Sequence, residues 1–582
     1  MLLLSLTFLF LKSTSFYDIF VLFTIIIVFY IFRFYYVYYT RPNKLPGPIP
    51  LPIIGSKYRM FTKNFRPIGM DELLKSLNSQ YGDIFEIWFG SERAVVLCHP
   101  KYMIKMHQTS TKSKYIKRFS GSDGKDYGLV DSGVFNNNDI HGSWKFNRMV
   151  FSNALMRPKL DRDALQWTVE LVEELESCWN RTGIIIDDNN VNKELIDNNE
   201  IINLPNWMRR FTYDMIYRIA IGNKGDALKS YINNLCGLNS YETESNSIIK
   251  STQTYADGIM YFRLFPEYIR NYFPYLRGII RRYLDNKMYL DGKLTEIIER
   301  RRSEIEKTPL DEELRNDMLT SFIITNTDRD MHKGKYVEKF EEEEVVIRPM
   351  KNEEICGNLM DAFIGGTDTT ANLFCFIVYY LAHHPEVLAC LRQEIDSIFQ
   401  DDKTRKITLK DLDNLKYCES IIKEVSRLQP IVSSNIRLNS EDDDIGGYIW
   451  PANTMFLLFY GAISKRSEAW NEPLKFNPDR FYNYIINDKI NGGNEYDDLG
   501  NNKNVGERSE SGDDIKNSFV MFGGGLRMCP GRKLAIIELK CLVTMIYRKY
   551  DVELIDINAP LKIKSTFITT CDELLFRLKL RK

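Results

Sequence analysis

The chain has 582 residues, of which 44% are hydrophobic and 27% charged, and its formal net charge is -1. This length suffices for several average domains or one unusually large one with an extensive core. A near-neutral chain has no overall attraction for nucleic acid, so no nucleic-acid partner is expected. The ten cysteines form no CxxC pair and follow no regular spacing, which is typical of reduced thiols in a domain that faces the cytosol.

An apolar stretch near the N-terminus is almost long enough to cross a membrane. From Ile19 to Tyr39 the chain is apolar apart from one threonine and one arginine, which approaches the roughly 20 residues that a spanning helix needs. A cleaved signal peptide is the alternative, but no small-residue cleavage site follows the apolar core. The basic residues Arg41 and Lys44 come after the stretch, and the positive-inside tendency then predicts a body that faces the cytosol. We expect residues 1–41 to be a single-pass membrane anchor.

A proline-rich segment follows the expected anchor. Five prolines lie within residues 42–55, and their fixed φ angles and missing N–H donors predict a stiff, extended hinge segment. A stiff segment at this place would determine how the body of the protein leans against the membrane. We expect residues 56–582 to form one large domain.

The remaining pattern predicts a mainly α fold with a minor β-sheet region. Residues Asp83 to Cys98 read as two short strands that turn at Gly90-Ser91. Helical periodicity is clearest in Pro205 to Ile221, Ile269 to Arg301, Glu353 to His384, Glu386 to Phe399 and Arg532 to Arg548. Further strand-like pieces are Ile436 to Leu438, Tyr448 to Trp450 and the stretch after Tyr550. Three very polar segments, 187–200, 328–344 and 483–517, are expected to be surface insertions.

The most specific motif lies near the C-terminus. It matches FxxGxRxCxG at all five fixed positions, which are Phe522, Gly525, Arg527, Cys529 and Gly531. A chance match in a chain of this size is on the order of one in ten thousand. The predicted helix that follows would place its positive end beside the sulfur, and positive charge lowers the pKa of a thiol. The motif therefore indicates a thiolate that ligates a metal, against the alternative of a glycine-rich turn with a buried cysteine.

This motif is similar to the haem-binding signature of the cytochrome P-450 family. The resemblance implies the cytochrome P-450 fold and haem b, iron protoporphyrin IX, bound through Cys529. It implies further that Arg527 pairs with a haem propionate, that Phe522 packs near the thiolate, and that Gly525 and Gly531 shape the haem-binding loop. It extends from about Pro46 to the C-terminus.

A second motif lies within the helix predicted from Glu353 to His384. Gly365 and Gly366 stand side by side in mid-helix, where each costs about 1 kcal/mol relative to alanine, so we expect local distortion or the close approach of a flat group. The resemblance makes Asp368 and Thr369 the family's acid–alcohol pair, which delivers protons during oxygen activation. A kinked helix with a threonine bonded to the preceding turn remains the alternative.

Other matches to the family are weaker one by one. Glu424 and Arg427 form an ExxR pair on one helical face, and Arg480 lies in NPDRF, which resembles the family's PERF segment with aspartate in place of glutamate. In the family these three residues lock the structure behind the haem. Trp144 and Arg148 match WxxxR, and Arg437 matches another propionate-binding arginine; a surface stack of tryptophan on arginine is the alternative for WxxxR.

These matches predict a monooxygenase that inserts one oxygen atom of O2 into a lipophilic substrate at the endoplasmic reticulum. Electrons would come from a separate NADPH-dependent reductase, with cytochrome b5 as a second candidate donor. Four basic residues, Arg527, Arg532, Lys533 and Lys540, are candidates for docking this partner, and a solvated basic face is the alternative. Two other functions stay open, a haem-thiolate isomerase or dehydratase without a reductase, and a non-catalytic haem-binding sensor.

Overall fold

The computed structural model describes residues 16–60, 68–110, 113–118, 124–128, 133–186, 202–236, 244–265, 267–330, 347–400, 402–483, 517–565 and 568–581. Its helices are α2 Phe16–Thr40, α3 Met70–Tyr81, α4 Met103–Met106, α5 Lys145–Leu155, α6 Pro158–Thr182, α7 Leu204–Ile221, α8 Ala227–Leu235, α9 Glu244–Leu264, α10 Glu267–Tyr272, α11 Pro274–Lys307, α12 Met318–Ile324, α13 Asn352–His383, α14 Pro385–Phe399, α15 Leu409–Asn414, α16 Lys416–Leu428, α17 Tyr460–Ile463 and α20 Arg532–Lys549. Its strands are β1 Ile84–Phe89, β2 Glu92–Leu97, β3 Ile185–Ile186, β4 Ser434–Leu438, β5 Asp443–Ile445, β6 Tyr448–Trp450, β7 Met455–Phe459, β8 Tyr550–Leu554, β9 Lys562–Ser565, β10 Thr569–Glu573 and β11 Phe576–Leu580.

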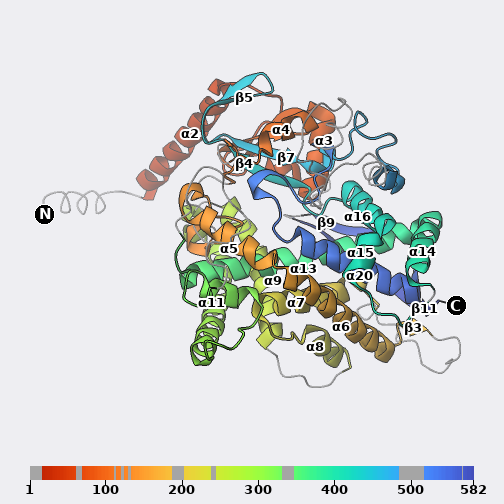
Figure 1. Cartoon of the computed structure of the whole chain (residues 1–582). Helices are drawn as coiled ribbons and strands as arrows, with labels where there is room; N and C mark the ends of the chain where they lie inside the picture. Colours follow the sequence, from red (N-terminus) through yellow and green to blue (C-terminus); the bar gives the residue numbers. More distant parts are fainter. Residues whose placement is uncertain are drawn as a thin grey trace.

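The fold is mainly helical with small sheets, as the sequence predicted. The largest sheet has the order β1-β2-β7-β4, in which β2 and β7 run parallel and the other neighbours antiparallel. It lies with α3 and α4 at one end of the molecule, while the long helices fill the other end (Figure 1). The predicted turn at Gly90-Ser91 joins β1 to β2. The polar segments expected as insertions fall almost entirely outside the described residues.

One predicted helix is in fact two. The periodic stretch from Ile269 to Arg301 is divided between α10 and α11, because Phe273 adopts extended backbone angles (φ -84°, ψ 112°) ahead of Pro274. A residue before proline is disfavoured in the helical region, since the proline ring clashes with its backbone. The prediction of a single helix was therefore wrong at this position.

Helix α2 matches the expected anchor. Within the described part of the chain it is the one straight helix that is long and apolar enough to cross a bilayer, with Phe20–Thr40 as the candidate span. It projects from one edge of the body (Figure 1). Its outer residues, such as Phe29 and Phe32, are more than 60% exposed, which is unfavourable in water and favourable in lipid.

Helix α13 forms the core of the helical region through its contact with α7. It runs without a break through Gly365 and Gly366, so the predicted distortion is absent. A Cβ atom on Gly366 would lie 2.7 Å from Cγ1 of Ile216 on α7, whereas a Cβ on Gly365 would meet no atom within 4 Å. Gly366 therefore allows the two helices to approach, and Gly365 borders open space.

The two glycines should respond differently to substitution. Gly366→Ala should lower the free energy of unfolding by about 1–3 kcal/mol, because it overpacks the contact with Ile216. Gly365→Ala should be neutral or stabilising by up to about 1 kcal/mol, since alanine favours the helix. Thermal unfolding of the full-length protein measures both effects. If the clash is the cause, Ile216→Ala should recover part of the loss in the Gly366→Ala background.

Candidate active site

The loop that carries Cys529 is a tight turn before α20. The Cys529 amide donates to the carbonyl of Phe522 at 2.9 Å, and the Met528 amide donates to the carbonyl of Gly525 at 3.0 Å. Gly525 has a φ of 65°, and a Cβ there would lie 2.6 Å from the carbonyl oxygen of Gln108. Only glycine adopts this conformation and this approach without strain. The turn thus needs glycine at position 525, because the backbone that follows α4 leaves no room for a Cβ atom there.

Burial dominates the acidity of the candidate ligand. It raises the pKa of the Cys529 thiol, although the Gly531 N–H group and the charges of Arg148, Arg532 and Arg118 act to lower it. The sequence predicted a lowered pKa from neighbouring positive charge. Those neighbours are present, but the loss of hydration outweighs them. A metal ion ligated by the sulfur would add positive charge and so favour the thiolate.

Arg527 and Trp144 form one buried unit. The guanidinium of Arg527 lies 4.1 Å from the centre of the Trp144 ring. It donates to the carbonyl oxygens of Ile116, Val134 and Asn137 at 3.0, 2.7 and 2.5 Å. The Trp144 indole also donates to the Val134 carbonyl, at 3.0 Å. The tryptophan is fully buried, and the arginine that stacks on it is Arg527. The alternative interpretation of Trp144 as part of a surface stack is therefore wrong.

Four arginines gather around the cysteine loop. Arg148, Arg437 and Arg527 were predicted for this site, and the structure adds Arg118, all of them nearly inaccessible to solvent. Burial and the charges of Arg437 and Arg148 lower the pKa of Arg118 to about 9, and burial with the other three arginines also lowers the pKa of Arg527. Like charges this close repel one another in a medium of low dielectric constant.

This cluster fits a dianionic cofactor. Nη2 of Arg437 is buried without a hydrogen-bond partner, and an orphaned guanidinium nitrogen costs free energy unless an anion completes it. Haem carries one metal for the thiol and two propionates for the arginines. The residues present therefore suit haem, with Cys529 as the candidate metal ligand and the arginines as candidate propionate partners.

Two contributors escaped the sequence analysis. Arg118 belongs to no motif. Asp361 on α13 accepts hydrogen bonds through Oδ2 from the amides of Val134 and Phe135, at 2.6 and 2.8 Å, and burial raises its pKa to about 6. It thereby holds the segment whose carbonyls bind Arg527. An isolated aspartate one turn before a glycine pair carries no recognisable spacing, so no signal in the sequence pointed to it.

Asp361 should control the order of this segment. Asp361→Ala leaves two amides without their acceptor, and the free energy of unfolding should fall by about 2–4 kcal/mol. Haem content per protein, measured by pyridine haemochrome, should fall with it. Asp361→Asn is the matched control, because its amide oxygen can accept both hydrogen bonds. Equal losses in the two variants would show that the charge, and not the acceptor, is what matters.

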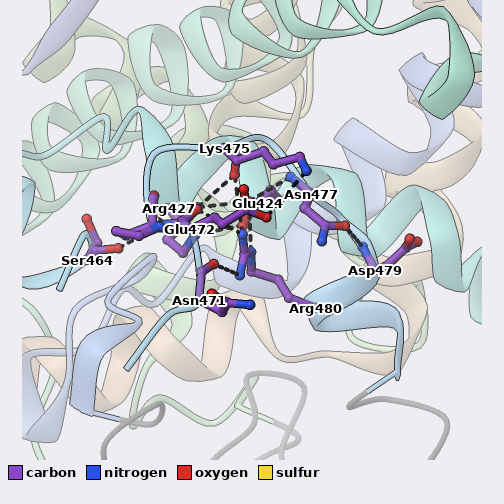
Figure 2. A network of polar contacts seen from close by, with 10 residues as sticks. Glu424, Arg427, Ser464, Asn471, Glu472, Lys475, Asn477, Asp479 and Arg480 are labelled. Atoms are coloured by element: carbon purple, nitrogen blue, oxygen red, sulfur yellow. Dashed lines mark hydrogen bonds and ion pairs between the residues drawn. The ribbon is translucent and has the colours of Figure 1, made fainter. Parts of the chain in front are cut away.

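The predicted Glu–Arg–Arg group comes together in the structure (Figure 2). Glu424 and Arg427 are fully buried and share two hydrogen bonds, of 2.7 and 2.8 Å. Arg480 donates to Oε1 of Glu424 at 3.0 Å. Arg427 also donates to the carbonyls of Ser464 and Pro473 at 3.1 and 2.7 Å. The Glu424–Arg427 pair thus joins α16 to the segments at 464, 473 and 480.

Removal of each arginine should have a different cost. Arg427→Ala removes the partner of the buried Glu424 carboxylate within α16. Breaking such a buried ion pair lowers the free energy of unfolding by about 3–5 kcal/mol. Arg480→Ala removes one charged hydrogen bond and should cost about 1.5–3 kcal/mol, since Arg427 still compensates Glu424. Chemical denaturation that follows tryptophan fluorescence measures both. A larger loss for Arg480→Ala would contradict this order.

The acid–alcohol pair lies on α13, which also contacts α20. The Thr369 hydroxyl donates to the carbonyl of Gly365 at 2.7 Å, as the alternative of a back-bonded threonine predicted. Its oxygen keeps lone pairs for a further hydrogen bond. Asp368 accepts from Nε of Arg209 on α7 at 2.9 Å, and about a quarter of its side chain is exposed. Arg209 is a third residue that the sequence analysis missed.

Comparison with known proteins gives the family. The family model described as Cytochrome P450 matches residues 45–579. The chain belongs to the cytochrome P450 family. It is 24% identical over 542 residues to (+)-vincadifformine 19-hydroxylase of Catharanthus roseus, with 90% of each chain covered. It is 22% identical over 552 residues to cytochrome P450 4d1 of Drosophila melanogaster, with 92% of this chain and 93% of the relative covered.

Membership of the family establishes the cofactor and the class of activity. Cytochrome P450 proteins bind haem, and the relatives include enzymes named as hydroxylases. This P450 is accordingly a haem-thiolate monooxygenase. The helical architecture with small sheets described above is consistent with the P450 fold.

Two of the four basic residues considered for partner docking are unsuitable. Arg527 and Lys540 are each 5% exposed, and Lys540 is bound internally to Glu419 at 2.6 Å. Lys533 is exposed but pairs with Asp161 at 2.6 Å. The prediction that Arg527 and Lys540 dock a partner was wrong, because Arg527 is bound to three backbone carbonyls in the interior and α20 turns the side chain of Lys540 into the core.

Proposed function

We propose that this P450 inserts one oxygen atom of O2 into a lipophilic substrate with electrons from a separate NADPH-dependent reductase. The observation that carries the proposal is the cysteine loop enclosed by buried arginines, together with the acid–alcohol pair on α13. Haem bound there would supply the chemistry of oxygen activation, which a thiolate ligand favours by donating electron density. Cytochrome b5 is a second candidate electron donor.

The residues of the loop would bind the cofactor. Cys529 would ligate the iron, with the Gly531 N–H group directed at the sulfur. Arg437 offers a free buried nitrogen to a propionate, and Arg148 is the second candidate. Arg527 would act with Trp144 through the three carbonyls that it binds, and so would position the segment over the cofactor. Phe522 and Gly525 would hold the turn.

Thr369 and Asp368 would move protons. The Thr369 hydrogen is donated to the Gly365 carbonyl, so its oxygen can accept a hydrogen bond from a donor on the open side of Gly365. Asp368 is partly exposed and held by Arg209; a carboxylate in that position can exchange protons with solvent. The pair thus has one member toward the reaction site and one toward water.

The apolar helix α2 supports a single-pass membrane location, with the catalytic domain in the cytosol at the endoplasmic reticulum. A protein held at a membrane meets substrates that partition into lipid, which favours a lipophilic substrate. The proposed domain division is an anchor at 1–41, a hinge segment at 42–55 and a haem-thiolate domain at 56–582.

The first test is the absorption spectrum of the reduced protein with carbon monoxide. A Soret band shifted far to the red is expected from an iron–thiolate bond. Cys529→His should lose this shift while haem remains bound through the imidazole. A wild-type band at the shorter wavelength of a histidine-ligated haem would contradict the assignment of Cys529.

The second test separates proton delivery from other functions. In Thr369→Ala, product formed per NADPH should fall on the order of tenfold or more, because proton transfer through positioned groups contributes roughly 10²–10⁴-fold. NADPH consumption should continue, with release of hydrogen peroxide. Thr369→Ser, which restores a hydroxyl, is the control. Product without reductase or NADPH would instead favour an isomerase or dehydratase, and haem binding without turnover would favour a sensor.

A further inference from the structure

The base of the candidate membrane helix is packed into the catalytic domain. Phe34 and Tyr38 are each 7% exposed, in contrast to the outer part of α2. Their rings meet the indole of Trp88 on β1 edge to face, with ring centres 6.1 and 5.8 Å apart. Aromatic pairs in this arrangement bury apolar area and restrict orientation. The last two turns of α2 are therefore part of the domain's own packing.

A buried carboxylate fastens the same region. Glu86 on β1 is 1% exposed and lies between two guanidinium groups, with Arg41 at 2.7 Å and Arg93 at 2.6 Å. Arg41 directly follows α2, and Arg93 belongs to β2. Arg93 also donates to the carbonyls of Pro42 and Asn43, at 2.7 and 2.5 Å. We call Arg41, Glu86, Trp88 and Arg93 the anchor clamp.

The segment expected to be a hinge is also bound to the sheet. The Glu86 amide donates to the carbonyl of Pro46 at 2.9 Å. A Cβ on Gly47 would lie 2.2 Å from the carbonyl oxygen of Glu86, so the segment and β1 are in close contact. The side chain of Asn43 donates to the carbonyl of Ile449 on β6 at 2.5 Å. These contacts leave the segment little freedom to rotate between α2 and the domain.

Energetics favours an orienting role for the clamp. Burying a carboxylate and two guanidiniums removes their hydration, and this desolvation cost cancels much of the free energy gained from their attraction. A hydrophobic contact of similar size would stabilise the fold about as well. Buried ion pairs differ from hydrophobic contacts in that they tolerate one geometry and penalise others. Three charges lie at the point where a long helix leaves the domain, so a change in the angle of α2 would separate buried ion pairs.

Exposed apolar side chains lie in and beside the segment that follows α2. Ile49, Leu51, Ile53, Ile54 and Ile449 are between 40% and 68% exposed. The first four belong to the segment that ends at Ser56, whose hydroxyl accepts from the Trp88 amide at 3.0 Å, and Ile449 is joined to Asn43. We call these five residues the collar. Four of them follow α2 in the sequence, and the fifth is held beside that segment through Asn43.

We propose that the anchor clamp holds α2 as a rigid strut and thereby keeps the collar in the headgroup region of the bilayer. This rests on the proposed function of α2 as a membrane anchor. The partner is the lipid surface, because the collar directly follows the candidate span and apolar side chains at such a boundary gain by leaving water. The domain then has one orientation on the membrane.

The test places a nitroxide label on the collar of the full-length protein in liposomes. The label is attached at Ile53→Cys, in a background where the exposed cysteines Cys236 and Cys390 are serine. Collisions with oxygen report lipid, and collisions with a water-soluble nickel chelate report solvent. With the clamp intact, the label at Ile53→Cys should collide frequently with oxygen and rarely with the nickel chelate. A label at Leu310→Cys, which is 82% exposed in a loop, should show the reverse.

Clamp variants then decide the mechanism. Glu86→Ala should raise nickel access at the Ile53 position severalfold while the protein stays bound to liposomes. Arg41→Gln should do the same and leaves the Glu86–Arg93 pair intact, which protects the fold. Asp83→Ala is the matched control, since the partner of Asp83 is Arg466, at 2.6 Å, and neither is part of the clamp. The carbon monoxide spectrum verifies the fold of each variant.

Each result has one meaning. Nickel access that is unchanged in both clamp variants overturns the role of the clamp. A wild-type Ile53 label in water overturns the role of the collar, and dipolar broadening between labels on two molecules would show that a second copy covers it instead. Wild-type protein that fails to bind liposomes refutes the membrane anchor itself, which is the separate proposal.

Discussion

The positive charge buried around one cysteine is the constraint on which the rest of this P450 depends. Arg118, Arg148, Arg437 and Arg527 come from four different segments, and they repel one another wherever water is excluded. The fold keeps them in place with backbone carbonyls and with the carboxylate of Asp361, and we propose that the haem propionates complete their neutralisation. A dianionic cofactor at such a site would offset positive charge that an uncharged ligand would leave uncompensated.

The structure supports that charged centre from two directions. Asp361 ties the segment at 134–135 to α13, and α13 is itself held by the close approach of α7 at Gly366. On another side Glu424 binds two arginines and so joins α16 to the loops at 464–480. Both devices use a carboxylate with more than one donor. Such networks specify a geometry well, since every missing partner would leave a buried charge.

Much of this protein could be predicted from short motifs. Glu424, Arg427 and Arg480 were expected to meet, and they do, because the ExxR spacing lies within one helix and its partner segment is recognisable. The helices α7, α13, α14 and α20 lie close to their predicted limits, because their periodicity is strong. The break at Phe273 was missed although Pro274 signalled it. The roles of Thr369, Asp368 and the haem-binding residues remain predictions.

The sequence by itself determined the fold class, the family, the anchor-like helix and the position of the candidate thiolate, because each is carried by residues close together in the chain. Only the tertiary structure decided which groups surround that thiolate. Arg118 approaches it from a distant segment, Asp361 and Arg209 bind other parts of the candidate site, and the acidity of Cys529 follows from burial. The same holds for Lys540 and for Glu86, whose partners are set by packing. Burial and contact are properties of the folded chain, and no local spacing encodes them.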